Sequence, residues 1–236
     1  MQKRKENNLI KTENWDPSLN FIIEEMNGSP LNVHKLLAKH PKLFKAWWNF
    51  RNYSVEGGDL GRRHGELVIL RVASYLKSWY EWSSHVDRSL KVGISLTEIQ
   101  NVNKILNPND WSDKEFLLLS AVDQLIENKR LSKAQYKKLS SHFSEQQIMD
   151  LIAIHGMYLI LGCMINIWEL VLDDEIQERL PSSITEKSFL DLNLIDSEVD
   201  LCFVFFPFTL FLHNSNELLL RFFLIIFLTS FSFMPN

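Results

Sequence analysis

Apolar residues recur at helical spacing from about residue 17 to residue 181, and no stretch before the C-terminal tail alternates as a half-buried strand does. The segment 66–73 is almost continuously apolar, which is typical of a helix buried on nearly all sides. Its two ionisable exceptions, Glu66 and Arg71, need polar partners if they are buried. The pattern predicts an all-α fold with the segment 66–85 at its centre.

This central segment should fold as an antiparallel helical hairpin. On one straight helix, Glu66 and His85 would lie about 28 Å apart, too far to cooperate. Ser78 and Glu81 have the spacing of a capping box, which predicts that a second helix begins there. A turn near residues 75 and 76 would bring Glu66 and His85 level with each other, across axes ~8–10 Å apart.

Three further capping-box patterns predict helix starts downstream: Ser95 with Glu98, Ser112 with Glu115, and Ser144 with Gln147. The last of these should open a long apolar helix that runs to about Leu170. On this helix His155 and Tyr158 share a face, so both are secondary candidates for a site.

The chain divides into three parts by composition. We expect a flexible lead-in over 1–16, one helical domain over 17–183, and an atypical Phe-rich hydrophobic tail of uncertain structure over 184–236. Between residues 201 and 236, Glu217 and Arg221 are the only charged residues apart from His213. A membrane span, an interfacial hairpin and translated non-coding sequence would each explain this tail, and we favour the last.

Charge and composition exclude several classes of function. The net charge of −4 and pI of about 6.0, with no nucleic-acid-binding motif, argue against a nucleic-acid partner. The two cysteines lack metal-ligand spacing, so we expect no metal site and no structural disulfide. Gly57, Gly58 and Gly61 precede no P-loop Lys-Ser/Thr, and we expect no cofactor. No apolar run of signal-peptide length follows the basic start, so we expect a cytoplasmic protein, with membrane association through 201–236 as an alternative.

The spacing of Glu66, Ser78, Glu81 and His85, the YEW-x-x-H motif at 80–85 and the GISLTEI segment at 93–99 resemble the carboxymuconolactone decarboxylase/AhpD-like superfamily. The AhpD-like peroxide reductases of that superfamily carry two cysteines where Ser78 and Glu81 stand here, so the chain resembles a thiol-free, decarboxylase-like branch. The resemblance implies an AhpD-like multi-helix bundle that assembles as a trimer or hexamer. Aromatic residues such as Trp47 and Trp48 would suit the subunit interface.

Candidate catalytic residues are Glu66, His85 and Tyr80. His85 would donate a proton, Glu66 would orient the imidazole and raise its pKa unless burial opposes this, and Tyr80 would hydrogen-bond a substrate oxygen. Arg71 or Arg62 would bind a substrate carboxylate. The remaining candidates for substrate binding are Ser78, Glu81, Trp82 and His155.

Three functions compete on this basis. The first is a carboxymuconolactone decarboxylase-like lyase that applies Glu/His acid–base chemistry to a small carbonyl-containing organic acid or lactone. The second is an AhpD-like peroxide reductase, which needs a low-pKa thiolate and a resolving thiol that Ser78 and Glu81 cannot supply. The third is a non-catalytic helical oligomer in which Glu66 and His85 form a structural pair. An enclosed cavity against His85 would favour the enzyme, whereas a fully packed His85 would favour the structural pair.

Overall fold

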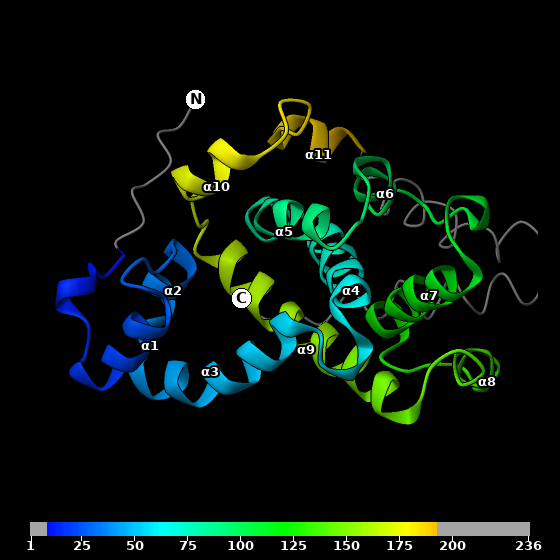
Figure 1. The fold of residues 1–236 in the computed structure, drawn as a ribbon, viewed down its shortest axis with the longest axis horizontal. Coiled ribbons are helices and arrows are strands. Elements are labelled where there is room, and N and C mark those ends of the chain that lie inside the picture. The colour runs from blue at the N-terminus through cyan, green and yellow to red at the C-terminus, as the bar shows by residue number, and fades with distance from the viewer. Residues whose placement is uncertain (1–8, 193–236) are drawn as a thin grey trace, which may run out of the picture. The chain divides into compact units, whose positions relative to one another are not determined.

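A computed structural model describes residues 9–192 of the chain, so the expectations about a membrane span, an interfacial hairpin or translated non-coding sequence over residues 201–236 fall outside this range. Within it the prediction of an all-α fold is confirmed, because the described residues form helices and short 3₁₀ turns with no strand (Figure 1). The α-helices are α1 Asn20–Glu25, α2 Asn32–Leu37, α3 Pro41–Glu56, α4 Arg62–Tyr75, α5 Trp79–Lys91, α6 Leu96–Asn101, α7 Asp113–Asn128, α8 Lys133–Leu139, α9 Glu145–Ile167, α10 Asp174–Arg179 and α11 Glu186–Leu192.

The hairpin of α4 and α5 lies at the centre of the fold, as the apolar pattern predicts. Helix α4 packs against α3, α5, α7 and α9, and Figure 1 shows it between these elements. Its middle residues, from Leu67 to Leu70, are fully inaccessible to solvent. A helix covered on all sides explains why its sequence lacks the polar face of a surface helix.

The turn between α4 and α5 differs from the predicted capping box. Lys77 adopts a positive φ of 50°, and the Ser78 N–H bonds back to the Ala73 carbonyl at 2.9 Å, which closes α4 with a Schellman motif. Helix α5 does begin at Trp79, but the Ser78 side chain accepts no capping hydrogen bond. The Ser78 amide is already used by the end of α4, so Glu81 has no cap to complete and its side chain is directed elsewhere.

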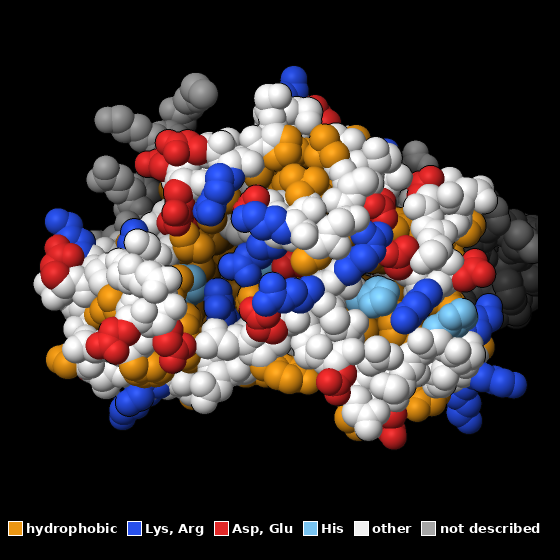
Figure 2. Space-filling model, viewed as in Figure 1, with side chains coloured by type: hydrophobic (Ala, Val, Ile, Leu, Met, Phe, Trp, Pro, Cys, Tyr) orange, Lys and Arg blue, Asp and Glu red, His pale blue; other side chains and the backbone are white. Residues whose placement is uncertain are grey.

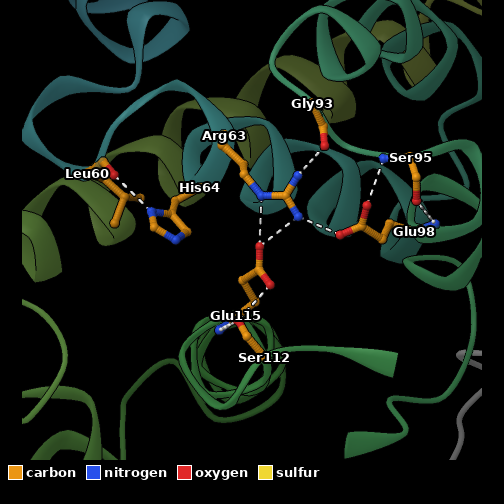
Figure 3. Close-up of polar contacts among 8 residues, drawn as sticks. All are labelled: Leu60, Arg63, His64, Gly93, Ser95, Glu98, Ser112 and Glu115. Carbon is orange, nitrogen blue, oxygen red and sulfur yellow. Dashed lines mark hydrogen bonds and ion pairs between the residues drawn. The ribbon is translucent and has the colours of Figure 1, made fainter. Parts of the chain in front are cut away.

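The predicted capping boxes at Ser95 and Ser144 are both formed. At Ser112 the hydroxyl accepts from the Glu115 amide at 3.3 Å, and Arg63 joins the starts of α6 and α7 to α4 (Figure 3). Arg63 Nε donates to Glu115 at 2.8 Å and Nη1 to the Gly93 carbonyl at 2.6 Å, while Nη2 reaches Glu98. One guanidinium therefore holds the start of α4, the end of α5 and the first turns of α6 and α7 together.

Packing extends beyond residues 17–183 at both ends. Trp15 is buried, with its ring 5.9 Å from that of Phe44. After residue 183, Phe189 on α11 is buried against Trp79 and Trp82, with ring centroids 5.8 and 5.0 Å away. The described helical unit therefore includes the end of the predicted lead-in and the first residues of the predicted tail.

Helix α9 is the one helix within residues 9–192 that is long and apolar enough to cross a membrane. Of the most apolar 18-residue stretch of this helix, 56% is buried inside the protein, as is typical of a core helix. Its outer side exposes Met149, Ile152, Ile160 and Ile167.

Trp48 is buried within the protomer, so it is not available for a subunit interface, and assembly into a homo-oligomer stays a prediction.

Phe189 and its neighbour Leu190 allow a matched test of the C-terminal boundary. The Phe189 side chain is 1% exposed and that of Leu190 is 50% exposed. We expect Phe189→Ala to lower the free energy of unfolding by about 3 kcal/mol, because it leaves a cavity against Trp82. Leu190→Ala should change it by less than about 0.5 kcal/mol. Urea unfolding of the two variants measures this, and equal effects would show that α11 does not cover the core.

Candidate active site

Glu66 and His85 meet across the α4–α5 hairpin, as their spacing predicts. His85 Nδ1 lies 2.7 Å from Glu66 Oε2, and the two residues are 7% and 4% exposed. A carboxylate can only accept, so Nδ1 carries the proton and donates it to this hydrogen bond. In the neutral ring Nε2 then has a free lone pair.

Burial decides the protonation of His85. It lowers the pKa of the imidazole below its ordinary value of 6.5, and the Glu66 carboxylate raises it without compensating fully. The positive charges of Arg88 and Arg51 lower it further. The expected rise of the His85 pKa is therefore reversed by burial, and at neutral pH the ring is mainly uncharged.

A cavity of about 260 Å³ opens against His85, near the lower end of the ~300–1,000 Å³ typical of small-ligand sites. Its walls come from α2, α3, α5, α9 and α10. Tyr158 of α9 lines it with its ring edge-on to His85, at a centroid distance of 5.0 Å. The lining also includes His34, Trp47, Trp48 and Ile165. His85 is therefore buried without being fully packed.

Cationic side chains surround this cavity. Arg51, Arg88, Lys91 and Arg179 line it, and Figure 2 shows Lys and Arg side chains gathered in the middle of one face, beside hydrophobic side chains. Lys91 is paired with Asp87 at 2.6 Å, and Arg179 lies beside Glu175. Arg51 stacks over the Trp48 ring at 5.1 Å. Arg51 Nη1 donates to Asn52 Oδ1 at 2.9 Å. Within residues 9–192, neither Arg51 nor Arg88 forms an ion pair, so the charge of both guanidinium groups is not neutralised by a carboxylate.

Sequence reasoning missed these two arginines and His34. Arg88 follows His85 by three residues on α5, so their shared helix face was a usable signal. Arg51 and His34 come from α3 and α2, and nothing in their local sequence indicates that those helices meet α5.

Tyr80 lines the cavity with its ring, but its hydroxyl is already engaged. It donates to Asp173 Oδ2 at 2.7 Å and accepts from the Val33 amide at 3.1 Å. Burial, followed by the Asp173 carboxylate, raises the pKa of this phenol well above 10.0. Tyr80 therefore links α5 to α2 and to the segment before α10. Its hydroxyl is occupied by these two protein partners, which differs from the predicted hydrogen bond to a substrate oxygen.

Glu81 lies at the cavity wall with its carboxyl turned towards α9. Both oxygens are shielded from solvent and have no hydrogen-bond partner among the described residues. A Cβ at Gly162 would collide with this carboxyl, so the glycine makes room for it. Burial raises the pKa of Glu81 well above 4.5, because desolvation disfavours the charged carboxylate.

Arg71 is a structural clamp rather than a substrate ligand. Its Nε and Nη2 donate to the two carboxylate oxygens of Asp123 at 2.7 and 2.8 Å. Nη1 donates to the carbonyls of Val102 and Lys104, each at 2.6 Å. The guanidinium is hydrogen-bonded to α7 and to the chain at the end of α6, and these bonds explain how a charge is tolerated in the buried helix α4. Arg62 is exposed and pairs with Glu56, outside the cavity.

Three other predicted residues also lie outside the cavity lining. The Ser78 hydroxyl is buried in the α4–α5 turn and has no hydrogen-bond partner among the described residues. Trp82 packs in the core against Phe189. His155 shares α9 with Tyr158 but does not line the cavity, and burial followed by the nearby Lys129 lowers its pKa. Over residues 9–192, no group of three or more His, Cys, Asp or Glu side chains could hold a metal ion.

Comparisons with known proteins agree with this geometry. Residues 41–124 match the carboxymuconolactone decarboxylase family, and they include Glu66, Tyr80, Glu81 and His85. No curated protein matches the chain by sequence.

Several solved structures share the fold. An uncharacterized peroxidase-related protein from Silicibacter sp. TM1040 has a TM-score of 0.62 at 18% identity, over 75% of this chain and 97% of its own. An uncharacterized peroxidase-related protein with an AhpD core from Ralstonia eutropha JMP134 has a TM-score of 0.62 at 18% identity, and the match covers 74% of this chain and 96% of that protein. A protein of unknown function from Agrobacterium tumefaciens, described as a putative antioxidant defence protein AhpD, has a TM-score of 0.52 at 21% identity. That match covers 58% of this chain and 94% of the Agrobacterium protein.

These structural likenesses establish the fold alone, while the family match covers the hairpin that carries Glu66 and His85. The chain therefore carries, over residues 41–124, a segment that matches the carboxymuconolactone decarboxylase family, on a fold shared with solved AhpD-like structures.

Proposed function

We propose that the protein is an acid–base enzyme of the decarboxylase-like kind, which acts on a small carbonyl-containing organic acid or lactone. The observation that carries this proposal is the buried Glu66–His85 pair, whose imidazole lines a cavity together with two arginines that form no ion pair among residues 9–192. A purely structural hydrogen-bonded pair needs no cavity against its imidazole and no arginine side chains lining that cavity.

The arrangement suits loss of carbon dioxide from a substrate whose carboxylate lies near a carbonyl group. When the C–C bond breaks, its electron pair moves onto the carbonyl and forms an enolate. His85, after taking up one proton from the substrate's acid group or from water, returns it to the enolate carbon. Glu66 stabilises the imidazolium in between, because its carboxylate accepts the Nδ1 hydrogen bond at 2.7 Å.

Arg51 and Arg88 would hold the anionic part of the substrate in this scheme. A cavity of about 260 Å³ admits a molecule of a few carbon atoms, and a guanidinium binds a carboxylate through paired hydrogen bonds. Their charge also stabilises the enolate as it forms.

A peroxide reductase is disfavoured because no cysteine lines the cavity. Cys163, the free cysteine among residues 9–192, is exposed on α9, and Ser78 and Glu81 stand where the thiol pair would be needed. Cys202 lies outside the described residues. Peroxide reduction needs a thiolate beside the acid–base pair, so this cavity lacks the reacting group.

The proposal is tested by carbon dioxide release and substrate loss over a panel of β-keto acids and carboxylated lactones. His85→Ala should lower kcat/KM about 10²–10⁴-fold on whichever substrate reacts, because it removes the proton donor. The wild-type kcat/KM should increase as pH falls from about 8 to about 6, since only imidazolium donates and its pKa lies below 6.5.

Glu66→Gln provides the matched control for this pH profile. The Glu66 carboxylate raises the His85 pKa, so its replacement should move the profile to lower pH while the amide oxygen still accepts from Nδ1. A wild-type rate that falls on acidification would contradict the role of His85 as donor. Turnover by His85→Ala at the wild-type rate would refute the proposed site.

Anion binding gives a separate prediction. Arg88→Gln should raise KM for a carboxylate substrate about 10-fold or more, because a charge-assisted hydrogen bond contributes about 1.5–3 kcal/mol. Arg62→Gln is the matched control, since Arg62 is exposed and pairs with Glu56 away from the cavity. Steady-state kinetics compare the two variants, and equal KM values would exclude Arg88 from substrate binding.

A further inference from the structure

His34 is held rigidly in the wall of the same cavity. It is the third residue of α2 and is 3% exposed. Its ring stacks on Phe44 at a centroid distance of 6.2 Å and meets Trp48 edge-on at 5.8 Å. Two aromatic neighbours thus fix the plane of an imidazole that lines the cavity.

The hydrogen bond of His34 at Nδ1 determines which nitrogen carries the proton. Nδ1 accepts from the Leu31 amide at 3.1 Å, so the neutral ring must be protonated at Nε2. Within residues 9–192 no acceptor contacts Nε2. A buried ring that lines a cavity therefore has one N–H donor without a protein partner.

Burial and the neighbouring arginines favour the neutral form of this imidazole. Burial lowers the pKa of His34 well below 6.5, and Arg51 of α3 and Arg88 of α5 lower it further. A carboxylate bound to Nδ1 would favour protonation, but here Nδ1 faces a backbone amide. His34 differs in this from His85, whose ring donates to Glu66.

We propose that the Nε2–H of His34 binds the carbonyl oxygen of the substrate and holds the enolate oxygen that forms there. The proposal rests on the proposed function and adds the group that polarises the carbonyl. A neutral imidazole is suited to this role because it donates a hydrogen bond without giving up its proton.

The step balances with the groups present. The bond between the carboxylate carbon and its neighbour breaks, carbon dioxide leaves, and the electron pair forms the enolate. The enolate oxygen accepts from His34 Nε2–H, and the imidazolium of His85 gives its proton to the carbon. His34 is then unchanged, and His85 has returned to its neutral form.

Two substitutions separate the two nitrogens of His34. His34→Asn keeps an acceptor near the position of Nδ1 and removes the cavity donor. His34→Gln keeps an N–H that reaches towards the position of Nε2 and loses the acceptor for the Leu31 amide. His40→Asn is the matched control, because His40 Nδ1 also accepts a helix-capping amide, from Leu43, while its ring lies outside the cavity.

The two His34 variants should rank in opposite orders by kcat and by melting temperature. We expect His34→Asn to lower kcat about 100-fold with little change in KM, as removal of an oxyanion donor does. His34→Gln should keep kcat within about 10-fold of wild type and have the lower melting temperature of the two. His40→Asn should leave kcat unchanged. A wild-type kcat in His34→Asn, or equal loss in both His34 variants, would overturn the proposal.

Binding of levulinate, a keto acid that does not lose carbon dioxide readily, tests His34 without turnover. Calorimetry should show binding to the wild-type protein that weakens about 10-fold in His34→Asn, as expected for loss of one hydrogen bond. If no panel substrate reacts but this difference is found, the proposed reaction fails while the carbonyl site stands. Levulinate binding that is absent at millimolar concentration, or equal in both proteins, overturns the His34 proposal.

Discussion

The hydrogen bond between Glu66 and His85 is the constraint on which the arrangement of the site depends. The Glu66 carboxylate, buried in α4, loses its hydration, and it is tolerated only with a close donor. The α4–α5 hairpin supplies that donor by placing His85 level with Glu66. The same burial that makes the pair necessary also lowers the pKa of His85, so the fold sets both the geometry and the protonation of the imidazole.

The two buried charged residues of α4, Glu66 and Arg71, differ in their surroundings, because a cavity lies beside the Glu66–His85 pair and none lies beside Arg71 among the described residues. Arg71, five residues further along α4, is enclosed by Asp123 and two backbone carbonyls. His85, in contrast, faces a cavity whose other walls carry Arg51, Arg88 and His34. One buried charge thus stabilises the packing of α4 against α7, while the other, Glu66, holds the imidazole of His85 that lines the cavity.

The sequence predicted those features that depend on local chain geometry. Hydrophobic periodicity indicated the helices, and the spacing of Glu66 and His85 with a turn between them indicated their contact. The Ser78 cap was wrong because the Ser78 amide completes a Schellman motif at the end of α4, which depends on the positive φ of Lys77. The role expected of Tyr80 was displaced by Asp173, a partner far along the chain. The approach of α2 and α3 to α5 is a tertiary event, so no local pattern indicated His34 or Arg51.

The protonation of His85 tests the central claim most directly. Nitrogen-15 NMR of the imidazole distinguishes the two neutral tautomers from imidazolium and follows them with pH. The structure predicts the Nδ1–H tautomer at about pH 7.5, with an apparent pKa below 6.5 because burial outweighs the Glu66 carboxylate. A ring protonated at Nε2 alone, or an imidazolium that persists at about pH 7.5, would contradict it.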